Sequence, residues 1–231
     1  MSGLLALEVA GVLFDMDGVL ISSIGSVNRS WRKWAEHYGL PNPETFQIEH
    51  GTRAVDTITR LKPDLDVSEG LQLIEDLEME DVADLKVLPG ARALLESLPP
   101  ERWAIVTSAT KRLLLGRLHA AELPVPDLFI SGDMVERGKP DPEPYRRGAE
   151  LIHSAPADCL VVEDAPSGVG AGIAAGCSVL GVLGTHTEKE LRAAGASWIV
   201  RSLEDVSAQT SPNGVTLHLR AISPITPARR A

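Results

Sequence analysis

Residues 12–20 have the sequence Val-Leu-Phe-Asp-Met-Asp-Gly-Val-Leu, in which an apolar run ends in two acids one residue apart. The valine, leucine and phenylalanine before Asp15 predict a buried strand. Because side chains at alternate positions of a strand lie on the same side, Asp15 and Asp17 can face one small site. A carboxylate at the end of a buried strand is costly unless a cation or hydrogen-bond donors meet it. Gly18 can supply the backbone angles of a sharp exit from the strand.

The pair of acids by itself has three interpretations. Asp-Gly is a common turn signal, so the first is a strand that runs into a polar turn. The second is an EF-hand calcium loop, which fails because Gly18 follows the second acid directly and because Ser26 occupies the position that needs a glutamate. The third is a metal-assisted nucleophile with an acid/base partner, which requires further groups from distant parts of the chain.

The composition of the chain narrows the classes of function. Its 231 residues, 44% of them apolar, suffice for one large domain or for a domain with an insert. The 32 acids outnumber the 22 lysines and arginines, and there is no basic cluster apart from the short Arg229-Arg230 tail. This charge balance argues against nucleic acid as a partner.

The chain also lacks the features of a membrane or secreted protein. No apolar run approaches the roughly 18 residues of a membrane span, and the N-terminus has no basic start or cleavage site of a signal peptide. Cys159 and Cys177 each lie beside an apolar run, which favours two buried, reduced thiols. We therefore expect a cytoplasmic monomer without a membrane partner.

After Asp17 the spacing of apolar residues changes to three or four, which predicts helices. Helices are expected over about 23–38, 52–61 and 67–85, in a block without a clear strand. From Pro89 onward, helices alternate with continuous apolar strands. The expected helices there span 89–98, 110–122, 142–153, 166–176 and 187–194, and the expected strands span 103–107, 128–131, 160–162, 179–182 and 198–200.

This alternation predicts an α/β fold with a parallel sheet that helices cover on both faces. A first strand over 9–14 must join the sheet, so the helical block is an insertion that stands over the strand ends as a cap. The expected division is residues 1–21 in the core, 22–87 in the helical cap and 88–231 in the core with a C-terminal extension. Residues 213–220 alternate with period two after an Asn-Gly turn and predict an extra edge strand.

Polar groups follow several of the predicted strands, at the edge of the sheet where α/β proteins bind ligands. Ser108 lies in a run of hydroxyls that leads into a helix, which favours a phosphate, although plain helix capping is the alternative. Lys139 precedes a proline that fixes the backbone, although a lone loop lysine is often simply solvated. Glu163 and Asp164 end an apolar strand. Together with the first two acids, these groups form a set for holding Mg²⁺ and a phosphoryl group.

Four motifs in this order resemble the phosphatases of the haloacid dehalogenase superfamily. They are Phe-Asp-Met-Asp-Gly-Val from residue 14, Thr-Ser-Ala from residue 107, Gly-Lys-Pro-Asp-Pro-Glu-Pro-Tyr from residue 138 and Val-Glu-Asp-Ala-Pro-Ser-Gly-Val-Gly-Ala-Gly from residue 162. The resemblance covers about residues 9–206 and implies a Rossmann-like parallel sheet core with an inserted α-helical cap. The stretch His-Gly-Thr-Arg at residues 50–53 is similar to the cap of glycerol-phosphate and 2-deoxyglucose-6-phosphate phosphatases.

The resemblance implies a mechanism through an aspartyl-phosphate. Asp15 is the implied nucleophile, and Asp17 is the implied acid that protonates the leaving alcohol and the base that then activates water. The implied cofactor is Mg²⁺, held by Asp15, the backbone carbonyl of Asp17 and Asp164, with Glu163 as a direct or water-mediated ligand.

The resemblance also implies the groups that bind the substrate. Lys139 offsets the charge of the phosphoryl group, and Ser108 binds a phosphoryl oxygen together with the backbone N–H of Ala109. Thr107 is the alternative to Ser108, because the choice depends on a one-residue alignment. The implied substrate is a small phosphorylated sugar or polyol. A hexose phosphomutase of the β-phosphoglucomutase type is the first alternative, and a haloacid dehalogenase, which needs neither Mg²⁺ nor the second acid, is a weaker one.

Arg53 is the candidate for reading the alcohol part of the substrate. It follows Gly51, which breaks the chain before a helix, so its side chain can point down at the core. A guanidinium can donate several fixed hydrogen bonds to hydroxyls or to phosphate. The alternative is that Arg53 pairs with Asp56 on the helix surface.

Overall fold

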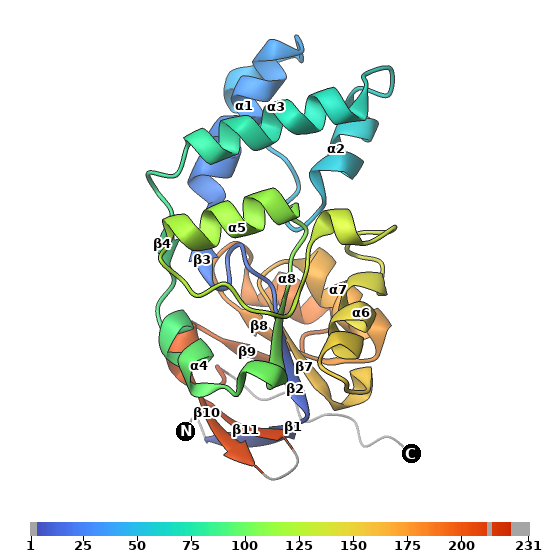
Figure 1. Ribbon diagram of the computed structural model, residues 1–231. Coiled ribbons are helices and arrows are strands. Elements are labelled where there is room, and N and C mark those ends of the chain that lie inside the picture. Colours follow the sequence, from blue (N-terminus) through green and yellow to red (C-terminus); the bar gives the residue numbers. More distant parts are fainter. Residues whose placement is uncertain (1–3, 212–213, 223–231) are drawn as a thin grey trace.

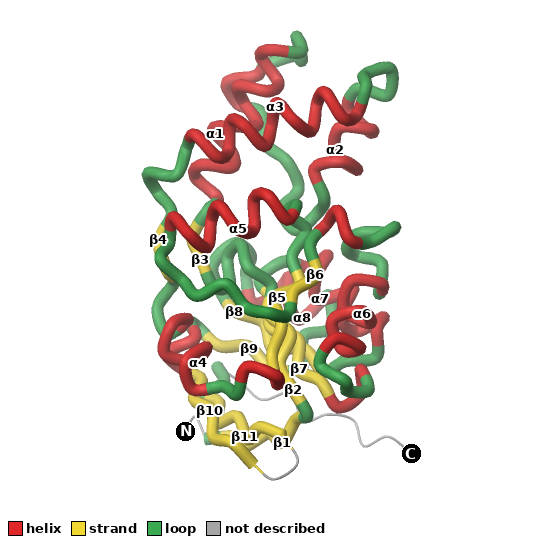
Figure 2. Tube along the Cα trace, in the orientation of Figure 1, coloured by secondary structure: helices red, strands yellow, loops and turns green. Residues whose placement is uncertain are grey.

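A six-stranded parallel sheet forms the centre of the computed structural model, which describes residues 4–211 and 214–222 (Figure 1). The strand order is β6-β5-β2-β7-β8-β9 (Figure 2). From β2 the chain first adds β5 and β6 on one side of the sheet, and then β7, β8 and β9 on the other side. The strands span Gly11–Phe14 for β2, Trp103–Val106 for β5, Phe129–Ile130 for β6, Cys159–Glu163 for β7, Ser178–Val182 for β8 and Trp198–Val200 for β9. The predicted parallel sheet is thus confirmed.

Helices cover both faces of this sheet. Val12 and Phe14 of β2 belong to one apolar cluster, whereas Leu13 between them belongs to a second cluster on the opposite face. This division follows from the alternation of side chains along a strand. The first cluster includes residues of α4 (Ala91–Ser97) and α5 (Lys111–Ala120), and the second includes residues of α6 (Glu143–Leu151), α7 (Pro166–Ala175) and α8 (Glu188–Ala193).

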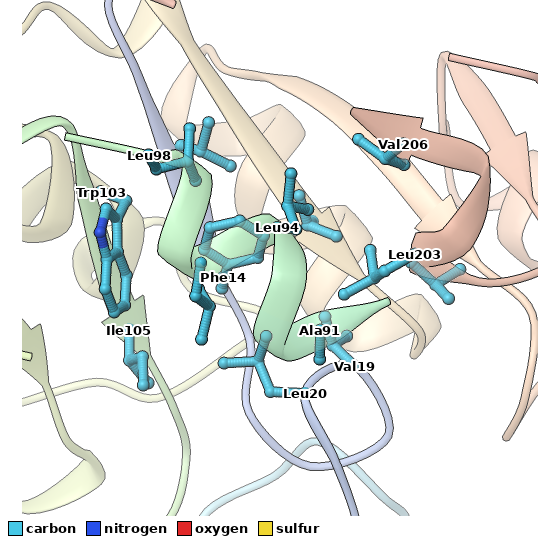
Figure 3. Close-up of a cluster of buried hydrophobic side chains, with 14 of the residues drawn as sticks. Phe14, Val19, Leu20, Ala91, Leu94, Leu98, Trp103, Ile105, Leu203 and Val206 are labelled. Atoms are coloured by element: carbon cyan, nitrogen blue, oxygen red, sulfur yellow. The ribbon is translucent and has the colours of Figure 1, made fainter. Parts of the chain in front are cut away.

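The first apolar cluster surrounds the ring of Phe14 (Figure 3). The ring of Trp103 meets it edge-on, with 6.2 Å between the ring centroids. Leu94 of α4, Leu98 directly after α4 and Leu203 after β9 complete this side of the core. The strand that precedes the two acids is therefore fully buried, as its composition predicts.

A second, antiparallel sheet has the order β1-β11-β10 and lies at the opposite end of the molecule from the cap (Figure 1). Its strands span Leu5–Val9, Gly214–Leu219 and Val206–Ser211 for β1, β11 and β10. The strand expected over 9–14 is present as β2 and joins the parallel sheet, but it begins at Gly11: Val9 belongs to β1, and Ala10 between them donates to the carbonyl of Asp158. The strand expected at 213–220 is present as β11, but it is the central strand of its sheet and not an edge strand.

Three helices form a separate group above the sheet, here called the cap (Figure 1). They are α1 (Ile24–His37), α2 (Ala54–Leu61) and α3 (Val67–Glu80). The chain enters and leaves the cap through the paired short strands β3 (Ile21–Ser22) and β4 (Lys86–Val87). Short 3₁₀ helices occur at Pro43–Thr45, Pro100–Arg102, Gly132–Met134, Pro156–Asp158 and Leu203–Asp205.

The cap has an apolar core of its own. Trp31, Trp34, Ile58 and Ile74 are fully buried in it, and the indole N–H of Trp34 donates to the carbonyl of Gly70 at 2.9 Å. This cluster consists of cap residues alone and is separate from the two clusters that cover the sheet.

Helix α3 ends at Glu80, five residues before the expected end at residue 85. No basic residue lies in its last turn, while acids crowd that end, which the helix dipole disfavours. Asp81 instead leaves the helix and forms an ion pair with Arg29 at 2.8 Å.

None of the described helices combines the length and the apolar sequence that a membrane-spanning helix needs. Cys159 and Cys177 are buried and free, as expected.

The close packing of α7 on the sheet gives a stability test. A Cβ atom at Gly172 would lie 2.9 Å from Val179, whereas at Gly170 the nearest atom is 3.9 Å away. We expect Gly172→Ala to lower the free energy of unfolding by about 1–2 kcal/mol through overpacking. Gly170→Ala is the matched control and should raise it by about 0.5–1 kcal/mol through helix propensity. Denaturant unfolding measures both; equal changes would contradict the tight α7–β8 contact.

Candidate active site

The site begins where three neighbouring strands end. Phe14 is paired with Ile105 of β5 and with Val162 of β7, so the next residue of each strand, Asp15, Val106 and Glu163, lies at a common level. The backbone N–H of Asp15 donates to the carbonyl of Val162 at 3.0 Å, which fixes this register. The sequence expectation that strand ends bring these acids together is met by this arrangement.

Lys139 joins the acids of the two central strands. Its ammonium group donates to Asp15 Oδ1 at 2.6 Å, to Glu163 Oε1 at 2.6 Å and to the carbonyl of Val106 at 3.0 Å. These are all three donors of the group, and the side chain is buried. Lys139 is therefore a buried member of the site and not a solvated loop lysine.

Glu163 is held on both of its oxygens. Oε1 also accepts from the hydroxyl of Tyr145 at 2.7 Å, and Oε2 accepts from the backbone N–H groups of Asp164 and Ala165 at 3.0 and 3.3 Å. A Cβ atom at Gly168 would lie 1.7 Å from Oε1, so the glycine makes room for this carboxylate. These contacts make Glu163 the anchor that holds Lys139.

Asp15, Glu163 and Asp164 offer oxygen ligands within 4.8 Å of one another. Burial raises the pKa of Asp15 to about 7, while Lys139 opposes this change and Glu163 adds to it. Burial also raises the pKa of Asp164 well above its ordinary value, and Glu163 adds to this effect. One lysine does not balance three buried acids, so the donor set fits a hard cation that prefers oxygen ligands, such as Mg²⁺.

Asp164 lies close to the turn that follows Asp15. Thr185, after β8, donates to Asp164 Oδ2 at 2.5 Å. Gly18 has a φ of +89°, and a Cβ atom there would lie 2.0 Å from the same oxygen. The glycine of the turn is therefore required both by its backbone angle and by the approach of the carboxylate.

The side chain of Asp17 lies outside this group of three acids. Ser23 donates to its Oδ1 at 2.5 Å, and Arg117 of α5 donates to its Oδ2 at 2.6 Å. The guanidinium of Arg117 also forms a buried ion pair with Glu78 of the cap helix α3. Burial by itself lowers the pKa of Arg117, but the two carboxylates raise it above its ordinary value. Burial raises the pKa of Glu78 to about 7, although Arg117 opposes this change.

The hydroxyl run after β5 is divided between two roles. Thr110 is the N-cap of α5, as the helix-capping alternative predicts. Ser108 donates instead to the carbonyl of Gly51 in the cap at 2.7 Å, and the backbone N–H of Ala109 donates to Thr107 Oγ1 at 3.1 Å. Ser108 thus connects the strand end to the cap.

Arg53 uses all five of its donors on protein atoms. It binds both oxygens of Asp56 at 2.7 Å, and it donates to the carbonyls of Gly132, Val135 and Glu136 at 3.3, 2.9 and 3.1 Å. These contacts match the ion pair with Asp56 that the sequence left open. They tie the cap to a loop of the core, and a substrate role of Arg53 stays a prediction.

A cavity lies between the cap and the strand ends. Its floor contains the three acids Asp15, Asp17 and Asp164 together with Ser108. Arg53 and Lys139 do not contribute to its lining. The cap contributes an apolar wall that includes Val27, Trp31 and Ile48, and polar side chains that include His50, Thr52 and Glu78. Burial lowers the pKa of His50, and His186 adds to this effect. A small substrate with both polar and apolar parts fits such a lining.

Sequence reasoning missed Glu78, Arg117, Ser23 and Thr185. A signal for two of them was available. Arg117 continues the buried row of Leu113, Leu114 and Leu118 in its helix, and Glu78 follows Ile74 by four residues. A charged residue on the apolar face of a helix needs a buried partner. Ser23 and Thr185 carry no such signal, because hydroxyls are ordinary at helix starts and in loops.

The strand-end acids and the buried lysine, beneath a helical cap, define the chain as a haloacid dehalogenase-like hydrolase. The chain belongs to this family, whose sequence model matches residues 9–176. The resemblance drawn from the sequence motifs is thus confirmed.

Individual relatives cover most of the chain. Hexitol phosphatase A from Escherichia coli (strain K12) is 37% identical over 209 residues, which cover 88% of this chain and 96% of the relative. The 2-deoxyglucose-6-phosphate phosphatase 1 of Saccharomyces cerevisiae is 32% identical over 239 residues, which cover 94% of this chain and 96% of the relative. A solved structure from Thermotoga maritima, described as a candidate β-phosphoglucomutase, has a TM-score of 0.62 and 29% identity and covers 86% of this chain and 96% of that one.

The contacts of Arg53 predict a local effect on the cap. We expect Arg53→Ala to speed amide hydrogen exchange of residues 132–138 by on the order of 10-fold, because hydrogen bonds from a charged group to that loop are lost. Arg60→Ala is the matched control, since Arg60 lies in α2 and makes no ion pair or hydrogen bond within the described part of the chain. Hydrogen exchange with mass spectrometry measures both, and equal rates in the two variants would contradict the role of Arg53 as a cap–core tether.

Proposed function

We propose that the chain hydrolyses phosphate monoesters of small sugars or polyols. The observation that carries this proposal is the buried carboxylate of Asp15, bound to Lys139 and lying beside Asp164, with Asp17 in the same cavity. The relatives support the substrate class, since they are a hexitol phosphatase and a 2-deoxyglucose-6-phosphate phosphatase.

Asp15 is the nucleophile in this proposal. Lys139 donates to its Oδ1, which favours the ionised carboxylate, and no residue that the structure describes donates a hydrogen bond to Oδ2. Oδ2 attacks phosphorus, and a bond from Asp15 to phosphorus forms as the bond to the leaving oxygen breaks. Asp17 gives its proton to the leaving oxygen, so the products of this step are an aspartyl-phosphate and a free alcohol.

The second step releases phosphate. Water attacks phosphorus, Asp17 takes the proton of the water, and Asp15 leaves as a carboxylate. Because Asp17 loses a proton in the first step and gains one in the second, the enzyme returns to its starting state.

Ser108 and the backbone N–H of Ala109 bind the phosphoryl oxygens in this proposal. A serine hydroxyl has one proton to donate, and that of Ser108 is donated to Gly51 of the cap. Phosphate binding therefore requires Ser108 to release the cap. This links the arrival of substrate to a change in the position of the cap.

Mg²⁺ is the proposed cofactor. Asp15, Asp164 and the backbone carbonyl of Asp17 would hold it, and when bound it offsets the charge of the phosphoryl group. Glu163 already accepts four hydrogen bonds within the protein, which favours a water-mediated role for this side chain.

A hexose phosphomutase is the second candidate function, because the Thermotoga maritima structure is described as a candidate enzyme of this type. A mutase keeps the phosphoenzyme long enough to return phosphate to the sugar. A panel of hexitol, glycerol and hexose phosphates with Mg²⁺, followed by ³¹P NMR, tests both functions. Inorganic phosphate supports hydrolysis, whereas a hexose 6-phosphate made from the 1-phosphate supports the mutase.

We expect Asp15→Asn to reduce turnover of the best substrate on the order of 10³-fold or more, because an amide is a poor nucleophile. Phosphate release measures turnover, and thermal unfolding checks that the variant is folded. Turnover within tenfold of the parent enzyme would refute Asp15 as the nucleophile.

Removal of divalent cations should strongly reduce activity. We expect EDTA followed by gel filtration to reduce turnover by about 100-fold or more, and Mg²⁺ to restore it. Calcium should not restore it, since it prefers more and longer oxygen contacts than Mg²⁺. As a second measurement, Mg²⁺ should raise the Tm of the parent enzyme and not that of Asp164→Ala. Activity that survives EDTA would favour the dehalogenase-like alternative.

A further inference from the structure

Glu78 is a buried acid that the proposed mechanism does not use. It lies on the cap helix α3, has only 7% of its surface exposed and lines the cavity above Asp15. A buried carboxylate is costly, and burial raises the pKa of Glu78 to about 7. That the Glu78 carboxylate is buried beside the cavity in spite of this cost indicates that it has a function there.

The two oxygens of Glu78 have different surroundings. Oε2 accepts a hydrogen bond from Arg117, which fixes the position of the carboxylate. Oε1 accepts no hydrogen bond from any residue within 4–211 or 214–222. A carboxylate oxygen can accept two hydrogen bonds, so Oε1 is an acceptor without a partner on a residue that lines the cavity.

The position of Glu78 relative to Asp17 indicates which part of a substrate it meets. Arg117 binds Glu78 with one nitrogen and Asp17 Oδ2 with the other, the latter at 2.6 Å. Only the guanidinium group of Arg117 therefore separates Glu78 from Asp17, the residue that protonates the leaving oxygen in the proposed mechanism. The phosphoryl group lies at Asp15 and Ser108, so the groups next to Asp17 face the carbon chain of the alcohol.

We propose that Glu78 is a specificity-determining residue that accepts a hydrogen bond from a hydroxyl of the leaving alcohol. This inference rests on the proposed function. The hydroxyl on the carbon next to the phosphate ester donates to Oε1 of Glu78, and Arg117 holds the carboxylate in place. A phosphate ester without that hydroxyl cannot make this hydrogen bond and leaves Oε1 without a partner on the substrate, which discriminates against such an ester.

Glu75 and Asp76 on the same helix differ from Glu78. Asp76 pairs with Arg112 of α5 at 2.6 Å and is about half exposed, and Glu75 binds Thr110 and Arg112. Neither residue lines the cavity. These two acids dock the cap on the core, so a variant of Asp76 removes a cap–core ion pair and leaves the cavity unchanged.

The test compares two substrates with the same carbon chain. Glycerol 1-phosphate carries hydroxyls on the two carbons beyond the ester, and n-propyl phosphate carries none. We expect Glu78→Ala to reduce kcat/KM for glycerol 1-phosphate by about 10- to 100-fold and for n-propyl phosphate by less than about threefold. Asp76→Ala is the matched control and should leave the ratio of the two kcat/KM values unchanged.

Glu78→Gln keeps the test valid if Glu78→Ala does not fold. The amide oxygen of glutamine can accept from Arg117, which turns its NH₂ group toward the cavity. The acceptor in the cavity wall is then replaced by a donor, while the contact with Arg117 is kept. The ratio of kcat/KM for glycerol 1-phosphate to that for n-propyl phosphate should fall about 3- to 10-fold.

The outcomes separate this inference from the proposed function. A parent enzyme that releases phosphate from no sugar or polyol phosphate refutes the proposed function. A parent enzyme that releases it but treats glycerol 1-phosphate and n-propyl phosphate alike overturns the inference. Equal losses on both substrates in the Glu78 variants also overturn it, because they would show that Glu78 acts only by docking the cap or by positioning Asp17.

Discussion

The buried ammonium group of Lys139 is the contact on which the arrangement of the site depends. An unpaired charge in the core is costly, so Asp15, Glu163 and the carbonyl of Val106 must all meet it. Those three groups come from β2, β7 and β5, and they meet only when the strands are in register. Tyr145 completes the arrangement by holding Glu163 at 2.7 Å. The sheet and the chemistry of the site are thus specified by the same set of contacts.

The groups of the core could be predicted from the sequence because each follows an apolar strand directly. Asp15, Glu163 and Asp164 end buried runs, and the carboxyl ends of parallel strands share one edge of the sheet. Glu78 and Arg117 could not be placed in this way, because they lie on two helices 39 residues apart in the chain. Each is visible only as a charge in an apolar row, and that pattern does not identify its partner.

The fold shows the same limit. The parallel sheet and the cap helices follow from local apolar patterns, and their predicted positions are close to those observed. The antiparallel sheet was mostly missed, because β10 is a polar strand and β1 alternates between exposed and half-buried residues. Such strands are specified by β11, which lies between them and is more than 200 residues from β1. Local patterns carry no information on a pairing of this length.

Two charged residues of the cap show why composition alone does not identify a substrate contact. Arg53 has the chemistry to bind hydroxyls, but all five of its donors are used within the protein. Glu78 was not predicted from the sequence as a site residue. Its side chain nevertheless lines the cavity, and one of its oxygens has no partner among the described residues. What makes a side chain available to a ligand is the number of donors and acceptors left after folding. Since Arg117 joins Glu78 to Asp17, one guanidinium holds both the group proposed to select the alcohol and the group proposed to protonate the leaving oxygen.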